Sequence, residues 1–365
     1  MSRSTAPRQG FRAGDWVRVR SADEILATLD EHGRLDGLPF MPEMLPFCGR
    51  RFRVYKSAHK TCDTVQSYMS RRMSGAVHLE GLRCDGEAHG GCKAGCLLFW
   101  KEAWLEPATA PASAHRPETE ASVRPEAGGR PETVPAAAAV AEMLARNTIA
   151  PSAEGGAEVR YSCQATDLVR ATTLLHPWDP RQYVKDLTSR NVTFGEFVRY
   201  ALLAAFNLVM HLNWRGRPYP YVCGLAGDKT QAETLDLQPG DLVQIRPKDE
   251  VMATLSAGQR NRGLWFDVEM VPFCGRTFRV LRRVEKIINE KTGAMIHLPG
   301  VCLVLEGVTC SGHHSRGRLF CPRSIYPFWH EIWLKRVEPA AAGHDATPLV
   351  KTAASSRDAG DARRA

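Results

Sequence analysis

Cysteine side chains carry the most evident chemistry in this sequence, and three of them recur at matched positions in two parts of the chain. They are Cys48, Cys84 and Cys92 in the first part, and Cys274, Cys310 and Cys321 in the second. The chain has 11 cysteines, an odd number that argues against a complete disulfide framework. Clustered thiols in a reducing compartment are more often metal ligands or catalytic groups than disulfides. The spacing therefore predicts a metal centre in each part.

The matched cysteines belong to a duplicated segment. With a shift of 226, 29 of the 71 positions from 14 to 84 are identical to positions 240 to 310. The strongest shared block, Pro46–Arg50, falls on Pro272–Arg276. Beyond this segment the second copy has three extra residues, and a shift of 229 then aligns Cys92 with Cys321. We therefore interpret residues 11–106 and 237–338 as two copies of one domain, called repeat one and repeat two below.

Strands must position these thiols, because each copy has the alternating pattern of a mostly β domain. Trp16–Arg20 alternates apolar and polar residues, as a half-buried strand does. Ser21 and Glu24 have the spacing of a capping box, which predicts a short helix as far as Leu29. Further strands are predicted at Arg51–Lys56, Val77–Arg83 and Leu97–Leu105. Four or five short strands in one copy predict a small closed barrel.

The strand positions predict that three thiols meet. Cys48 precedes the strand Arg51–Lys56 and Cys84 follows the strand Val77–Arg83, so antiparallel pairing would bring both thiols to one end of the barrel. Cys92 lies in the loop that leaves that end. Residues 55–78 would form the remote tip of this hairpin, where the copies differ most. Cys62 aligns there with Ile288, and Cys302 aligns with Ala76, so we expect neither Cys62 nor Cys302 to be a ligand.

A closed tetrahedral site needs a fourth ligand, usually a cysteine or a histidine. Repeat one offers His89 or Cys96, whereas repeat two offers His313 or His314 and has Ile325 at the position of Cys96. Three cysteines and one histidine are thus available to both copies, and four cysteines only to repeat one. The sequence leaves the cofactor open between zinc and an iron–sulfur cluster.

The ends of each copy resemble a known fold class. The opening Gly-Asp-x-Val-x-Val/Ile-Arg and the terminal Trp-Leu resemble SH3-like and KOW-type barrels. That resemblance implies a small barrel and no particular function. The chain also resembles an uncharacterised bacterial family of duplicated cysteine-containing domains, through the stretch Met-Val-Pro-Phe-Cys-Gly-Arg-Thr-Phe-Arg-Val at 270–280. That resemblance implies no function.

The remaining segments complete an α+β multidomain prediction of two small SH3-like β-barrels flanking a helical segment. Residues 1–10 and 339–365 are expected to be disordered, residues 107–158 to form a flexible linker with a short helix near Val140–Arg146, and residues 159–236 to be helical, above all 165–214. The stretch Phe194–Trp214 contains the charged residues Glu196 and Arg199. Its uninterrupted apolar part is too short for a membrane-spanning helix, which needs about 20 apolar residues. We expect a buried or amphipathic core helix there.

Composition narrows the function only in part. The net charge of +8 is spread along the chain, which is typical of a mixed-sign surface. The first residues lack the apolar core of a signal peptide, so a cytoplasmic location is expected. P-loop, dinucleotide, Gly-x-Ser-x-Gly and His-Glu-x-x-His motifs are absent from the sequence.

Three interpretations of function remain open. The leading one is a non-catalytic metal-binding protein that acts as a binding or accessory module for a protein partner, since two similar modules on a linker suit bivalent binding. The second is a metalloenzyme or redox protein with its working centre in repeat one, where Cys96 stands beside His89. The third is a nucleic-acid-binding protein. Whether the chain is an enzyme stays undecided.

Overall fold

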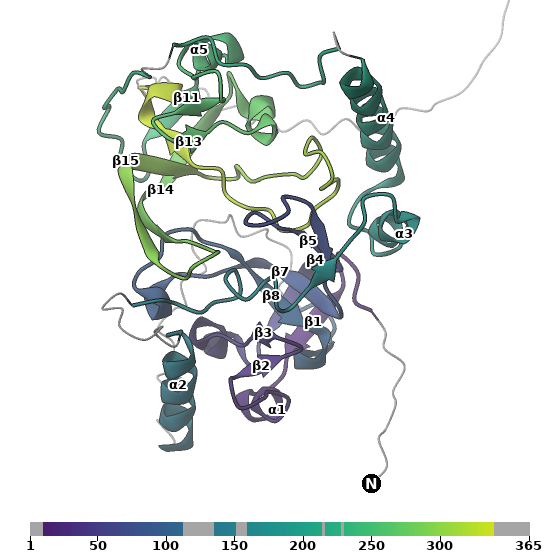
Figure 1. Ribbon diagram of the computed structural model, residues 1–365. Helices are drawn as coiled ribbons and strands as arrows, with labels where there is room; N and C mark the ends of the chain where they lie inside the picture. Colours follow the sequence, from purple (N-terminus) through teal and green to yellow (C-terminus); the bar gives the residue numbers. More distant parts are fainter. Residues whose placement is uncertain (1–9, 112–134, 151–158, 214–215, 228–229, 339–365) are drawn as a thin grey trace, which may run out of the picture.

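Two antiparallel five-stranded sheets, one from each repeat, form the body of the protein in the computed structural model, which describes residues 10–111, 135–150, 159–213, 216–227 and 230–338 (Figure 1). The first sheet has the order β8 (Leu97–Lys101), β7 (Ala76–Arg83), β4 (Arg51–Ser57), β1 (Trp16–Val19), β9 (Leu105–Pro107). The second has the order β16 (Trp329–His330), β15 (Met295–Leu305), β14 (Thr277–Ile288), β11 (Leu242–Ile245), β17 (Leu334–Arg336). Each strand of the first sheet therefore has a counterpart in the second.

Local sequence explains why these elements form where they do. In β1, Val17 and Val19 point into the core and are fully buried, while the residues beside them are partly exposed. Helix α1 (Ala22–Leu26) begins at the predicted capping box, in which Ser21 and Glu24 bond each other's backbone. The antiparallel pairing of β4 with β7 is also confirmed, with Val54 opposite Leu79.

The predicted closing strand Leu97–Leu105 is wrong in detail. A 3-10 turn, η3 (Glu102–Trp104), separates β8 from β9. Trp100 and Trp104 therefore do not share one strand, yet both are fully buried and both contact Phe40 edge-on. They pack in the core of repeat one. The fold is mixed α+β, rich in strands, and contains a curled half-barrel sheet. The first sheet has β8 and β9 at its two edges, and the second has β16 and β17.

Smaller elements surround the sheets. Two hairpins pair β2 (Arg34–Leu35) with β3 (Leu38–Pro39) and β12 (Arg260–Asn261) with β13 (Leu264–Trp265), and a three-stranded sheet has the order β10 (Thr173–Leu174), β6 (Ser70–Arg72), β5 (Lys60–Cys62). The short helices are α5 (Lys248–Ala253), η1 (Pro42–Phe47), η2 (Glu87–His89), η4 (Val268–Phe273) and η5 (Glu331–Trp333).

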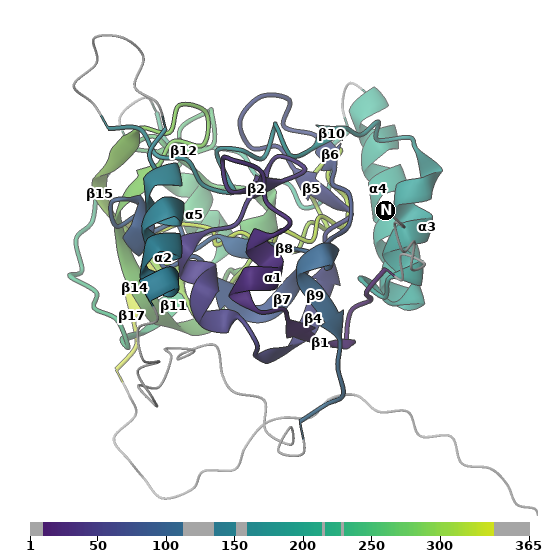
Figure 2. The same cartoon turned by 90° about the horizontal axis from the view of Figure 1, so that it is seen from below.

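The segment between the repeats is helical only in part. It forms α2 (Pro135–Asn147), α3 (Pro180–Thr188) and α4 (Phe194–Leu212), whereas residues 164–179 form turns and β10 instead of the predicted helix. Helix α4 lies at the side of the body beside α3 (Figures 1 and 2). It has no buried residue, so the buried alternative of that prediction is wrong. One side of α4 packs through Phe197 on Phe320 and through Tyr200 on His313. Of the described helices, none combines the length and apolar character that crossing a bilayer requires. The predicted disorder at 1–9 and 339–365, and most of the predicted linker, fall outside the described residues.

A buried ion pair fastens the hairpin tip of repeat one to α3. Lys60 in β5 is fully buried and its Nζ lies 2.6 Å from Oδ2 of Asp186, which is also fully buried. Oδ1 of the same carboxylate lies 3.2 Å from Nε2 of His59. Burial lowers the pKa of Lys60, and the Asp186 carboxylate opposes that shift. The ammonium group therefore depends on this carboxylate to remain charged inside the protein.

Removal of the carboxylate is expected to destabilise the protein strongly. Asp186→Asn leaves the buried Lys60 ammonium without a countercharge and should lower the free energy of unfolding by about 3–5 kcal/mol. Urea denaturation followed by circular dichroism measures this change. Arg72→Gln is the matched control, because the Arg72–Asp179 pair has the same length of 2.6 Å but is half exposed at the arginine, and it should cost about 0–1 kcal/mol. Equal effects of the two substitutions would contradict the argument.

Candidate metal centre

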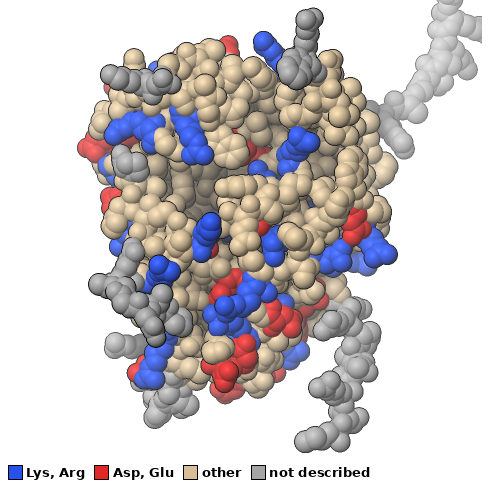
Figure 3. All heavy atoms as spheres, in the orientation of Figure 1, with Lys and Arg blue, Asp and Glu red and all other residues tan. Residues whose placement is uncertain are grey.

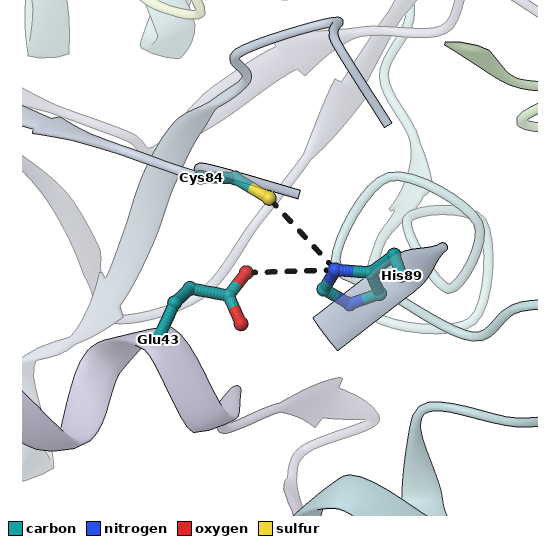
Figure 4. A group of neighbouring side chains, drawn as sticks. All are labelled: Glu43, Cys84 and His89. Carbon is teal, nitrogen blue, oxygen red and sulfur yellow. Dashed lines mark hydrogen bonds and ion pairs between the residues drawn. The ribbon is translucent and has the colours of Figure 1, made fainter. Parts of the chain in front are cut away.

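Glu43, Cys84 and His89 converge in repeat one and form a group of potential metal ligands (Figure 4). One donor atom from each lies within 4.8 Å of the other two. His89 Nδ1 is 4.0 Å from Cys84 Sγ and 3.8 Å from Glu43 Oε1. The His89 and Glu43 side chains are 1% and 5% exposed, so the three donors meet away from solvent.

Three short elements bring these side chains together. Glu43 lies in η1, Cys84 follows directly after β7, and His89 ends η2. The loop that starts at Cys84 is closed at its base, where the Cys84 backbone N–H donates to the Cys96 carbonyl at 2.8 Å. Gly86 begins η2 with φ of 79°, a left-handed conformation that favours glycine. The turn directs the His89 ring toward Glu43 and Cys84 (Figure 4).

The protonation states of Glu43, Cys84 and His89 are compatible with a metal-binding site. Burial raises the pKa of Glu43 and raises that of the Cys84 thiol well above its usual value, and the neighbouring Glu43 adds to the second shift. Burial lowers the pKa of His89 to about 4, so its ring is neutral near pH 7. Both Glu43 carboxylate oxygens and His89 Nε2 are buried without a hydrogen-bond partner of ordinary geometry among the described residues. Buried polar atoms are usually satisfied, so this group is incomplete as it stands.

Three further thiols line the same small pocket. Cys92, Cys96 and Cys163 face it together with Cys84 and His89. Cys163 arrives from the segment between the repeats, and the neighbouring Gln164 holds it there. The Gln164 side-chain amide accepts from the Phe99 N–H at 2.8 Å and donates to the Phe99 carbonyl at 2.9 Å. It thus pairs with the edge strand β8 as a neighbouring strand would. Burial raises the pKa of Cys96 to about 11 and that of Cys163 to about 12.

Not every ligand predicted for repeat one takes part. Cys84, His89, Cys92 and Cys96 all line the pocket, but Cys48 does not. It caps the end of η1 and is half-buried against the hydrophobic core of its own repeat. Burial raises the pKa of its thiol to about 11. The six-residue turn η1 places Glu43 at the pocket and leaves Cys48, five residues later, outside it.

Repeat two uses the same framework differently. Glu269 aligns with Glu43 at the shift of 226, but its carboxylate is fully bonded. It accepts hydrogen bonds of 2.7–2.9 Å from the loop after Cys310, which come from Ser311 Oγ, His314 N, Ser315 N and Ser315 Oγ. Burial would raise the pKa of Glu269, but these hydrogen bonds outweigh it and lower the pKa. Glu269 thus anchors the loop that Glu43 leaves free.

The histidines predicted as ligands in repeat two lie against α4. The His313 ring stacks on Tyr200 with 3.9 Å between centroids, and His314 meets the same ring edge-on at 5.7 Å. Neither joins a close ligand group with cysteines among the described residues. Cys274 caps η4 as Cys48 caps η1.

Cys310 and Cys321 have an unexpected neighbour. Cys62, from the hairpin tip of repeat one, is a neighbour of Cys321, and both residues are buried. Interaction with Cys321 lowers the pKa of Cys62 to about 6, burial opposes the shift, and Arg323 contributes to it. Cys310 lies within electrostatic range of both thiols. Cys62, which the sequence predicts not to be a ligand, joins no close ligand group among the described residues.

Sequence reasoning missed Glu43 and Cys163 at the pocket of repeat one, and Cys62 as a neighbour of Cys321. Glu43 carried a usable signal, because it is identical in the two copies and lies three residues before their strongest shared block. Cys163 and Cys62 have no cysteine counterpart in the other copy, so alignment of the repeats could not find them. No family model, curated protein or solved structure matches this chain. The argument for function therefore rests on the site itself.

Substitution of Gly86 tests whether the loop turn holds the site. A Cβ added at Gly86 would lie 1.9 Å from the Cys92 carbonyl oxygen, so Gly86→Ala must displace the loop. Gly49→Ala is the control, because Gly49 has a similar φ of 75° but nothing within 4 Å of the added Cβ. The control should cost about 1–2 kcal/mol from backbone conformation alone. Gly86→Ala should cost about 1–3 kcal/mol more and speed alkylation of Cys92, measured by denaturation and mass spectrometry. Indistinguishable variants would refute the turn's role.

Proposed function

We propose that this chain is a metal-binding protein whose principal centre holds zinc between Glu43, Cys84 and His89. The convergence of their three donor atoms is the observation that carries the proposal, and both Glu43 oxygens lack a hydrogen-bond partner of ordinary geometry among the described residues. Tetrahedral zinc has Zn–N and Zn–O distances of about 2.0–2.2 Å and a Zn–S distance of about 2.3 Å, which place neighbouring donors about 3.3–3.7 Å apart. The present separations of 3.8 and 4.0 Å need only a small closure.

Charge balance supports a divalent ion at this site. An ionised Glu43, a Cys84 thiolate and a neutral His89 ring together carry two negative charges, which one zinc ion neutralises. A neutral centre suits a buried pocket, where a net charge would be strongly disfavoured. Zinc binding would release the Cys84 proton, because the free thiol is protonated near pH 7.

The surrounding pocket offers the fourth ligand. Cys92, Cys96 and Cys163 line it, and its volume of about 40 Å³ has room for an ion with a water molecule. A fourth thiolate would close the site, as in structural zinc centres, whereas a water molecule would leave it open for chemistry. The leading proposal is the closed, structural form, because buried thiols surround the pocket; a fourth thiolate would give that form one net negative charge, so the neutral balance describes the centre with three protein ligands alone.

The wider role we propose is that of a binding or accessory module. In each sheet the last strand follows a 3-10 turn and returns to pair with the first strand, β9 with β1 and β17 with β11, which is compatible with the SH3-like barrels that the sequence predicts. Two such modules would present paired surfaces to a protein partner. A nucleic-acid partner has less support, because positive and negative side chains are interspersed over the lower part of the face in Figure 3.

An iron–sulfur cluster is the second candidate, and a specific observation favours it. Four thiols, those of Cys84, Cys92, Cys96 and Cys163, line one pocket without crowding into a single close group. Clusters are held by four cysteine thiolates around an inorganic core several ångströms wide, so they need ligands spaced farther apart than zinc does. This arrangement would make repeat one a redox centre, and Glu43 and His89 would then flank the cluster.

Metal analysis tests the zinc proposal. The full-length protein, purified without oxygen, should contain zinc, and Cys84→Ser should remove one equivalent of it. The loss of affinity should exceed the roughly 10–100-fold that follows removal of a group which only supports a ligand. Cys48→Ser is the matched control, since Cys48 is a half-buried cysteine of the same repeat outside the pocket, and its zinc content should equal that of the wild type. Retention of full zinc content by Cys84→Ser would disprove the site.

Absorption spectra separate the two candidates. Zinc protein should be silent in the visible region, whereas a cluster would give an absorption band at about 400 nm together with iron and acid-labile sulfide. Cys163→Ser distinguishes them further. If the protein holds a cluster with Cys163 as a ligand, this substitution should abolish the absorption band. If the protein holds zinc, the substitution should lower zinc affinity only when Cys163 is the fourth ligand. Iron and sulfide in the anaerobic protein would decide against zinc.

A further inference from the structure

Helix α4 carries a row of large apolar side chains on the side that faces away from the body of the protein (Figures 1 and 2). Their spacing of three or four residues places them along one face of the helix. The exposed fraction of each residue lies between 38% and 80%. We call this row the α4 stripe, and it consists of Phe194, Val198, Leu202, Phe206, Val209 and Leu212.

The opposite side of α4 attaches the helix to the rest of the protein. The Phe197 and Tyr200 rings stack on aromatic rings of repeat two, with centroids 5.6 and 3.9 Å apart. The Asn207 side-chain amide donates to the Tyr219 carbonyl at 2.6 Å and accepts from the Tyr219 N–H at 2.7 Å. At about 100° per residue, Phe197, Tyr200 and Asn207 lie on the side of the helix away from the stripe. The contacts that hold α4 therefore leave the stripe uncovered by the described residues.

The composition of this face favours an apolar partner. No charged residue occurs from Tyr200 to Met210. The exposed Ala205 lies within the stripe, and a small residue there allows a second helix to approach closely. An apolar face of this width normally packs on a core, and a contiguous exposed patch of this kind marks an interaction site.

Segments of the same chain offer no matching surface. The two longest stretches outside the described residues, 112–134 and 339–365, contain few large apolar residues. These are Val123, Val134, Leu349 and Val350. Such stretches cannot supply a row of six large side chains, whereas α4 of a second copy supplies one.

Two copies of the stripe match each other when the helices run antiparallel. The midpoint of α4 is Leu203, so a twofold axis close to it places Leu202 beside Phe206 of the second copy. By the same count the residues at the two ends of the stripe, Phe194 and Leu212, come together. Antiparallel helices also bring the positive end of each helix dipole to the negative end of the other. The stripe is therefore complementary to itself, as a twofold interface requires.

The area of the stripe is sufficient for a dimer. Large aliphatic and aromatic side chains have about 150–200 Å² of surface each, so at these exposed fractions the stripe offers about 600 Å² per copy. Pairing would bury up to about 1,200 Å² in total, which is the lower end of the range for stable protein interfaces.

We propose that the α4 stripe is a dimerisation surface, on which the α4 stripe of a second copy packs antiparallel. The same helix contacts repeat two through Phe197 and Tyr200, so the pairing sets one copy of repeat two on each side of the two helices. This inference goes beyond the proposed metal binding and does not depend on it.

Sedimentation equilibrium on the full-length protein tests the dimer. The wild type should have twice the 40.4 kDa mass of one chain. Leu202→Glu should weaken the dimer by at least about 100-fold, because a twofold pair then buries two carboxylates against apolar side chains. Leu225→Glu is the matched control, since Leu225 is also 66% exposed but lies outside α4, and it should stay dimeric. Circular dichroism checks that both variants keep the helix content of the wild type.

A mixing experiment tests the antiparallel arrangement. Leu202→Lys and Phe206→Glu should each be monomeric alone. When they are mixed, the lysine of one copy faces the glutamate of the other, and the mass of a dimer should return. Parallel helices would set residue 202 beside residue 202, so the two charges would not meet and the mixture would stay monomeric.

Two results would overturn the proposal. One is a wild type that sediments as a monomer, even if phospholipid vesicles or another protein then bound the stripe. The other is a dimer that survives both Leu202→Glu and Phe206→Glu, because its interface would then lie elsewhere. A mixture that does not recover the dimer rejects the antiparallel arrangement.

Discussion

The buried ion pair between Arg323 and Glu290 is the interaction on which both cysteine groups depend. The Arg323 side chain is 3% exposed, and its guanidinium lies 2.8 Å from the Glu290 carboxylate. Thr64, in the tip of repeat one, bonds the same carboxylate at 2.6 Å. Arg323 follows Cys321 by two residues, and Glu290 lines the pocket of Cys84. A buried charge without its partner costs several kcal/mol, so the two tips and the two loops are held in one arrangement.

Within that arrangement the same glutamate has acquired two uses. Glu269 is satisfied by its own loop, which is rich in hydroxyl and backbone donors, whereas the loop opposite Glu43 offers the Cys84 thiol and the His89 ring. The difference follows from the loop sequences. Ser311 donates its hydroxyl proton to Glu269, whereas repeat one has Asp85 at the matching position, and an ionised carboxylate cannot donate to Glu43. An unsatisfied carboxylate is tolerated in a core when something outside the chain completes it, which is why Glu43 and not Glu269 indicates a site.

The sequence was most informative where interactions are local. Alternation located the principal strands, the capping box located α1, and antiparallel pairing placed Cys84 beside the loop that carries Cys92. It failed where geometry depends on distant packing. The 3-10 turn η1 directs Glu43 to the pocket and Cys48 away from it, and packing of the hairpin tip of repeat one against repeat two brings Cys62 near Cys321. Helix α4 has an amphipathic pattern but no buried residue, since periodicity alone does not say what covers a face.

If the proposed centre holds an ion, the position of thiols such as Cys92 between the repeats would couple metal binding to the docking of the two repeats. Cys92 contacts the tip of repeat two, so an ion bound at its loop would favour the docked arrangement over one with separated repeats. Such linkage amounts to about 2.7 kcal/mol when the free ion is at 100 times its Kd. The reverse also holds, because a partner that pulled the repeats apart would weaken metal binding by the same free energy. A metal bound at the joint would therefore influence how the two modules are presented, which is the physical reason we propose an accessory role over an isolated catalytic one.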